Sequence, residues 1–147
     1  MNEIFVYIGY FLLFINCLIC LKSFSKNGKA FRIFTYYSLT MFAVQMAAHF
    51  MSSYGKNNLF LSHFYFIIQF ILLSLFYIKI LHDKFQKKVI SINLFLCLAL
   101  LMIHYALDWS RFYRFNTFET FILSLPLIVY ATFHLYNMLN QEKEYYY

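Results

Sequence analysis

The chain has 147 residues, of which 63% are hydrophobic and 24% aromatic, and only 12% carry a charge. A water-soluble domain of this length needs more charged surface. The composition therefore excludes a soluble enzyme or receptor domain and indicates one membrane-embedded domain. The net charge is +6, but the basic residues stand beside apolar segments, which is typical of membrane loops. We expect no nucleic-acid partner.

Apolar segments long enough to cross about 30 Å of hydrocarbon recur along the chain. Short polar turns separate them, and none of these turns is long enough to form a soluble domain. We predict an all-α fold, a polytopic transmembrane helical bundle in which residues 1–147 form a single domain, with spans at residues 4–21, 33–51, 59–81, 89–107 and 117–139. The lipid bilayer is thus the first expected partner.

Basic residues are distributed unevenly between the two ends of this predicted bundle. Most of them follow the first span or flank the turn after the third: Lys22, Lys26, Lys29, Arg32, Lys79, Lys84, Lys87 and Lys88. The opposite end has only Lys56, Arg111 and Arg114. The positive-inside rule then predicts a multi-pass membrane protein with its N-terminus outside and its C-terminus in the cytoplasm. We expect anionic lipid at the cytoplasmic basic loops.

Polar residues within each predicted span fall on one face of the helix, which predicts a bundle with a partly polar interior. The stripes comprise Gly9, Asn16 and Cys20; Ser38, Gln45, His49 and Ser52; Ser62, Tyr65 and Gln69, with His63 to one side; Asn93, Cys97, His104 and Asp108; and Asn116, Thr120 and His134, with Glu119 at the margin. Arg111 and Arg114 join this interior from the turn before the last span.

Five ionisable residues of this set share a layer near the outer end: His49, His63, His104, Asp108 and Glu119. A charged group that faces lipid costs about 2.5–3.5 kcal/mol. We therefore expect these side chains to face inward and to pair. Arg111 and Arg114 are the natural ion-pair partners for Asp108 and Glu119.

Two interpretations of this layer stay open. In the first, His104, Asp108 and Glu119 are candidate acid–base catalysts, and the candidate ligands of a divalent transition metal are His49, His63, His104 and Asp108. In the second, the same side chains only form hydrogen bonds between helices. No local motif of the HExxH type supports the first. We predict no cofactor and keep a divalent metal as the alternative.

Two other features of the spans have simple explanations. Cys17 and Cys20 have the spacing of a redox or metal pair, but they lie in the middle of a predicted membrane helix without a second pair. We interpret both, together with Cys97, as packing residues. Pro126 lies inside the last span, where its missing N–H is expected to free a backbone carbonyl.

Residues 58–77 and 115–122 resemble the corresponding segments of small uncharacterised multi-spanning inner-membrane proteins of Bacteroidota. The similarity covers the third to fifth spans, about half of the chain. It implies a helical bundle in the inner membrane. It implies no activity, and no residue role follows from it.

Three classes of function are compatible with these features. We favour a sensor, regulatory or assembly subunit that acts through helix contacts, as a homo-oligomer or with a membrane protein partner, because soluble domains and local catalytic motifs are missing. The first alternative is an intramembrane metal-dependent or acid–base enzyme that uses the outer histidine and carboxylate layer. The second is an oligomeric channel or small transporter lined by the polar stripes.

Overall fold

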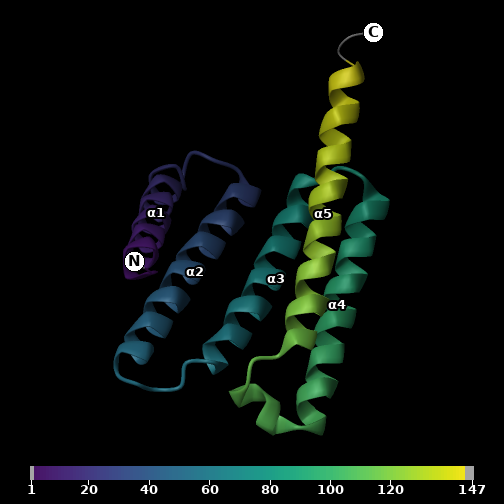
Figure 1. Ribbon diagram of the computed structural model, residues 1–147. Coiled ribbons are helices and arrows are strands. Elements are labelled where there is room, and N and C mark those ends of the chain that lie inside the picture. Colours follow the sequence, from purple (N-terminus) through teal and green to yellow (C-terminus); the bar gives the residue numbers. More distant parts are fainter. Residues whose placement is uncertain (1, 145–147) are drawn as a thin grey trace.

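The computed structural model describes the backbone of residues 2–144 and the side chains of residues 4–140. Within these limits the chain consists of helices α1 (Asn2–Lys22), α2 (Lys29–Ser53), α3 (Phe60–Ile80), α4 (Lys84–Leu107) and α5 (Thr117–Glu144), with a short 3₁₀ helix η1 (Trp109–Tyr113) before α5. The predicted all-α bundle of five long helices is confirmed (Figure 1). Residues 145–147 of the predicted cytoplasmic tail lie outside the described part.

Four helices, α1, α3, α4 and α5, are long and apolar enough to cross a membrane. Helix α2 has 25 residues, which is sufficient length, but it is less apolar than the others. It lies between α1 and α3 in a row of helices that alternate in direction (Figure 1). The crossing by α2 therefore remains a prediction, based on its position in the row.

The five helices are not packed equally. Helices α3, α4 and α5 contact one another and form a three-helix unit. Helix α2 packs against α3, and within the described residues α1 contacts α2 alone (Figure 1). The thiol of Cys17 on α1 donates to the Ser38 carbonyl oxygen of α2 at 3.4 Å. Cys17, Cys20 and Cys97 are free and buried, as expected for packing residues.

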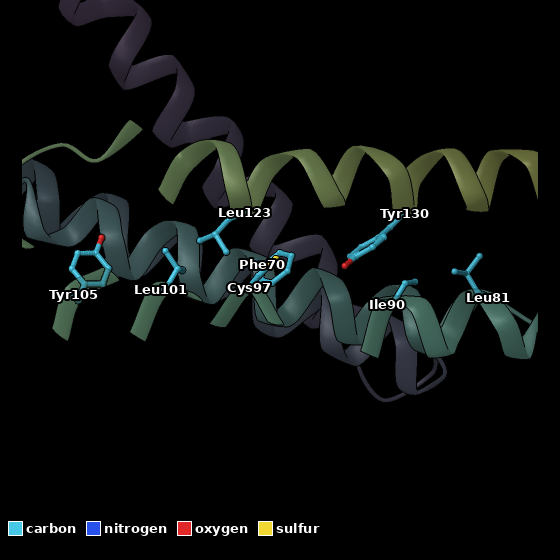
Figure 2. Close-up of a cluster of buried hydrophobic side chains, with 8 residues drawn as sticks. All are labelled: Phe70, Leu81, Ile90, Cys97, Leu101, Tyr105, Leu123 and Tyr130. Atoms are coloured by element: carbon cyan, nitrogen blue, oxygen red, sulfur yellow. The ribbon is translucent and has the colours of Figure 1, made fainter. Parts of the chain in front are cut away.

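The apolar core lies within the three-helix unit (Figure 2). Its buried members are Phe70, Leu81, Ile90, Cys97, Leu101, Tyr105, Leu123 and Tyr130. Because lipid tails are as apolar as these side chains, close packing and hydrogen bonds between helices must hold the unit together. Most other large apolar side chains are exposed, as expected for helices that face lipid.

Polar contacts recur along the α4–α5 interface. The Asn93 side-chain amide donates to the Tyr130 hydroxyl at 3.0 Å. Pro126 has no N–H for the carbonyl of Ile122, and the thiol of Cys97 lies 3.7 Å from that oxygen. The carbonyl that Pro126 was expected to free thus has a partner on the neighbouring helix.

The turns are closed by local side-chain and backbone chemistry. The Asp83 carboxylate accepts a hydrogen bond from the backbone N–H of Phe85 at 2.8 Å and caps α4. Gly55, after α2, has φ of +64°, a left-handed conformation that glycine adopts without strain. Because the helices alternate in direction, the α2–α3 turn and the η1 segment lie at one end of the bundle, and the α1–α2 and α3–α4 turns lie at the other (Figure 1).

The amides of Gln86 and Asn137 exchange two hydrogen bonds between α4 and α5, at 3.3 and 2.8 Å. We predict that Gln86→Leu lowers the free energy of unfolding by about 1–3 kcal/mol, because it leaves the Asn137 amide unpaired. The double variant Gln86→Leu/Asn137→Leu should recover most of this loss. Unfolding in detergent measures both. A double variant as unstable as the sum of the single variants would contradict the prediction.

Candidate functional site

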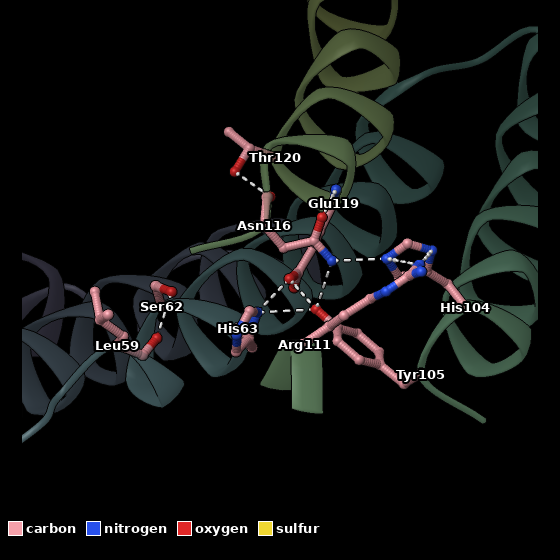
Figure 3. Close-up of polar contacts among 9 residues, drawn as sticks. All are labelled: Leu59, Ser62, His63, His104, Tyr105, Arg111, Asn116, Glu119 and Thr120. Carbon is pink, nitrogen blue, oxygen red and sulfur yellow. Dashed lines mark hydrogen bonds and ion pairs between the residues drawn. The ribbon is translucent and has the colours of Figure 1, made fainter. Parts of the chain in front are cut away.

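Three side chains from three helices meet at the end of the bundle that carries η1 (Figure 3). His63 lies near the start of α3, Tyr105 near the end of α4, and Glu119 in the first turn of α5. His63 and Glu119 are each 1% exposed, and Tyr105 is 8% exposed. We call these three residues the His63–Tyr105–Glu119 cluster. A carboxyl group buried this deeply requires hydrogen-bond partners or neutralisation.

The start of α5 positions Glu119. Asn116 immediately precedes the helix, and its Oδ1 accepts a hydrogen bond from the backbone N–H of Glu119 at 3.3 Å. In a capping box with this spacing, the glutamate side chain turns back to the capping residue. Here the carboxylate points into the bundle, toward His63 and Tyr105 (Figure 3). The N-terminus of α5 also favours a negative charge at this position.

The hydrogen bonds of the cluster converge on one oxygen atom. Glu119 Oε2 accepts from the Tyr105 hydroxyl and pairs with Nδ1 of His63. The Tyr105 oxygen lies 2.9 Å from the same Nδ1 and accepts from the Asn116 amide at 3.3 Å. Because the hydroxyl proton points to Glu119, the consistent arrangement also places a proton on Nδ1, directed at the same carboxylate oxygen.

Two atoms of the cluster have no hydrogen-bond partner among the described residues. These are Nε2 of His63 and Oε1 of Glu119, and both are buried. An unsatisfied buried group costs about 1–3 kcal/mol. A protonated imidazole would hold a proton at Nε2 without an acceptor, whereas a neutral ring leaves only a lone pair there. The cluster is therefore sensitive to proton transfer and to any polar group that reaches these atoms.

Aromatic side chains of η1 cover the cluster. Phe112 stacks on the His63 ring, with 5.0 Å between the centroids and 27° between the planes. Trp109 also stacks on Phe112, at 5.4 Å between the centroids and 13° between the planes. This cover keeps bulk water from the carboxyl group and strengthens the electrostatic interactions inside. It also couples the indole of Trp109 to the imidazole of His63 through a single ring.

A second polar group surrounds Arg111, closer to the surface. Arg111 Nε donates to the Asp108 carboxylate at 3.0 Å, and its Nη1 lies 3.2 Å from His104 Nδ1. Hydrogen bonds from Ser110 and from Arg111 hold the pKa of the Asp108 carboxyl below its ordinary value. The Asn116 amide donates to His104 Nε2 at 3.0 Å. Asn116 therefore connects the surface group to the buried cluster.

The residues of the predicted outer layer do not form one group in the structure. His63 and Glu119 are brought into contact, while His104 and Asp108 gather around Arg111. The expected Arg111–Asp108 pair is present. The pairing of Glu119 with an arginine was wrong within the described residues, because α3 and α4 supply the partners of this carboxyl from inside the bundle.

The remaining candidates lie elsewhere. His49 packs edge-on against Tyr10 of α1, at 5.2 Å between the ring centroids. Gln45 lines a cavity between α2 and α3, and Gln69 has a buried carbonyl oxygen without a partner in the described part of the chain. His134 lies beside Tyr77, at 6.4 Å between the centroids. Among the contacts of the described residues, none joins these four side chains to the cluster.

The donor set of the cluster bears on the metal hypothesis. Among the side chains that the structure describes, no three histidine, cysteine, aspartate or glutamate residues gather closely enough to hold a metal ion. His63 and Glu119 are two donors of suitable chemistry, and the phenol of Tyr105 is beside them. This set favours proton chemistry and hydrogen bonding as the basis for function.

Sequence reasoning missed Tyr105. A tyrosine at the end of a membrane helix is typical of the interfacial aromatic belt, and this explanation conceals an inward-facing hydroxyl. A signal was nevertheless available: Tyr105 follows Cys97 and Leu101 at intervals of four residues, so all three lie on neighbouring turns of one face. All three are buried.

No protein-family model, curated protein or solved structure matches this chain. The function must therefore be inferred from the geometry of the cluster and from the arrangement of the helices around it.

The Tyr105 hydroxyl can be removed without loss of its ring. We predict that Tyr105→Phe lowers the free energy of unfolding by about 1–3 kcal/mol, because Glu119 Oε2 loses a donor and Asn116 an acceptor. Paired with Glu119→Gln in a double-mutant cycle, it should show a coupling energy of about 0.5–3 kcal/mol. The matched control is Tyr65→Phe on the α2-facing side of α3. Equal effects of the two phenylalanine variants would exclude a special role for Tyr105.

Proposed function

We propose that this protein is a sensor or regulatory subunit of the membrane, and that it senses through a change of charge and hydrogen bonding in the His63–Tyr105–Glu119 cluster. The proposal depends on one observation: an imidazole and a carboxyl, each 1% exposed, are in contact between separate helices. Both groups can exist with or without a proton. A change of charge at this place alters the bonds that join α3, α4 and α5.

The energy of this contact is large enough for a switch. Leaving a buried donor or acceptor without its partner costs about 1–3 kcal/mol, and more for a charged group. Two conformations of a protein that differ by a few kcal/mol are already a bistable element. Loss or gain of one proton at the cluster is therefore sufficient to change which arrangement of the three helix ends is the stable one.

Helix α5 can transmit such a change from the cluster to the other end of the bundle. It begins beside Glu119 and has 28 residues, a length of about 40 Å at 1.5 Å per residue. Its far end extends past the ends of α3 and α4 (Figure 1). In the C-terminal half of α5, Leu135, Tyr136 and Leu139 are more than half exposed. We propose this segment as a contact for a second copy or for a membrane protein partner.

The proposed orientation places the cluster on the outer side of the inner membrane. It is supported by the basic residues, which gather at the end that carries the α1–α2 and α3–α4 turns. Such loops remain in the cytoplasm and attract anionic lipid. A sensor with this topology would detect conditions outside the cell membrane and deliver its response through α5 to the cytoplasmic side.

An intramembrane acid–base enzyme is the second candidate, and the unpartnered Nε2 of His63 and Oε1 of Glu119 favour it. These atoms could receive a substrate, or a metal could bind beside them. Elemental analysis of the purified protein separates the metal-dependent form of this alternative from our proposal. We expect no stoichiometric metal, and one equivalent of zinc or manganese that is lost in Glu119→Gln would favour the enzyme.

The only tryptophan is a natural reporter of the cluster. We predict that Trp109 fluorescence changes on the substitution His63→Gln, because the indole stacks on Phe112 and Phe112 stacks on the His63 ring. The control His49→Gln should leave the fluorescence unchanged. Fluorescence that His63→Gln leaves unchanged but His104→Gln alters would assign the coupling to the surface group and contradict the proposal.

A further inference from the structure

A cavity of about 340 Å³ opens beside η1 and the first turn of α5. Its polar lining consists of His104, Arg111, Arg114, Asn116 and Thr117. Phe115 and Phe118 form an apolar border, and both are exposed, by 57% and 47%. We call this the η1 cavity. It is separate from the His63–Tyr105–Glu119 cluster, none of whose members lines it.

The η1 cavity has an excess of positive charge. Arg111 is paired with Asp108, but Arg114 makes no ion pair within the described residues. The nearest other carboxyl group along the chain, Glu119, does not line the cavity, and its Oε2 is bonded to His63 and Tyr105. Two guanidinium groups therefore stand against one exposed carboxylate, which leaves Arg114 available for an anion.

The donor set selects the chemistry of the ligand. Both guanidinium groups donate only, in a planar fork that suits phosphate oxygens. Asn116 also lines the cavity, with its amide nitrogen bonded to His104 and Tyr105. The first backbone N–H groups of α5 have no acceptor within the helix. The border of Phe115 and Phe118 suits an apolar substituent at the membrane interface. We infer that the η1 cavity binds a phosphate group, carried by a lipid headgroup or by a soluble phosphate.

Binding at this cavity would reach the sensor through Asn116. One amide nitrogen of Asn116 is in hydrogen-bond contact with both His104 and Tyr105, at 3.0 and 3.3 Å. A phosphate that attracts this amide weakens its bond to the Tyr105 oxygen and changes the donors around Glu119. This coupling, but not the binding itself, rests on the proposed function of the cluster.

The test uses the full chain in maltoside micelles, which contain no phosphate. Phosphatidylglycerol, inorganic phosphate and diacylglycerol are added separately, and the shift of the unfolding temperature gives the apparent affinity of each. We expect phosphatidylglycerol or inorganic phosphate to stabilise the protein, and diacylglycerol, which lacks the phosphate, to have no comparable effect. The phosphate source with the larger shift identifies the natural form of the ligand.

Arg114→Gln should weaken this affinity about tenfold, as expected for the loss of one charge-assisted contact. Lys56→Gln is the matched control, because Lys56 is a basic residue in the other turn at the same end of the bundle and does not line the cavity. Absence of any phosphate-dependent shift, or an equal loss in the two variants, would overturn the site. Glu119→Gln should keep the shift, so a failed switch and a failed binding site give different results.

Discussion

The carboxyl group of Glu119 lies between three helices, and its burial is sustained by two donors directed at one of its oxygens. One donor comes from His63 on α3 and the other from Tyr105 on α4. An unpaired carboxylate in this environment would be costly enough to expel the side chain or to protonate it. Because Glu119 needs both donors, the neighbouring ends of α3, α4 and α5 are fixed relative to one another. The side chains of η1 cover the cluster and exclude water from it.

Polar contacts also join α4 and α5 further along their interface. Asn93 pairs with Tyr130, the thiol of Cys97 lies near the carbonyl that Pro126 frees, and Gln86 pairs with Asn137. Because apolar packing alone does not distinguish one helix register from another in lipid, such polar contacts specify the register. Among its described residues, helix α1 has no comparable series, and the thiol of Cys17 donates to a carbonyl oxygen of α2. The three-helix unit is consequently the part in which a local change of bonding has a defined structural effect.

The sequence was sufficient for the number of helices and for the layer that contains His63 and Glu119, because apolar length and the order of turns determine both. It was insufficient for their pairing, which depends on how each helix is rotated. Helix α3 has neighbours on two sides: Ser62 and Tyr65 line the cavity toward α2, whereas His63 faces α4 and α5. A single polar stripe cannot represent a helix with two buried faces. The inward orientation of Tyr105 was not predicted for a related reason, since a tyrosine at this position in the sequence suits contact with lipid headgroups equally well.

Asn116 shows why the identity of a capping residue matters here. Aspartate or serine would cap α5 about as well, because each offers an oxygen to the backbone N–H of Glu119. Neither offers the amide N–H groups that reach His104 and the Tyr105 hydroxyl. Aspartate would in addition place a second carboxylate next to Glu119. Among the favoured caps, only asparagine also joins the group around Arg111 to the buried cluster by hydrogen bonds without adding a charge, so this hydrogen-bonded connection depends on one side chain.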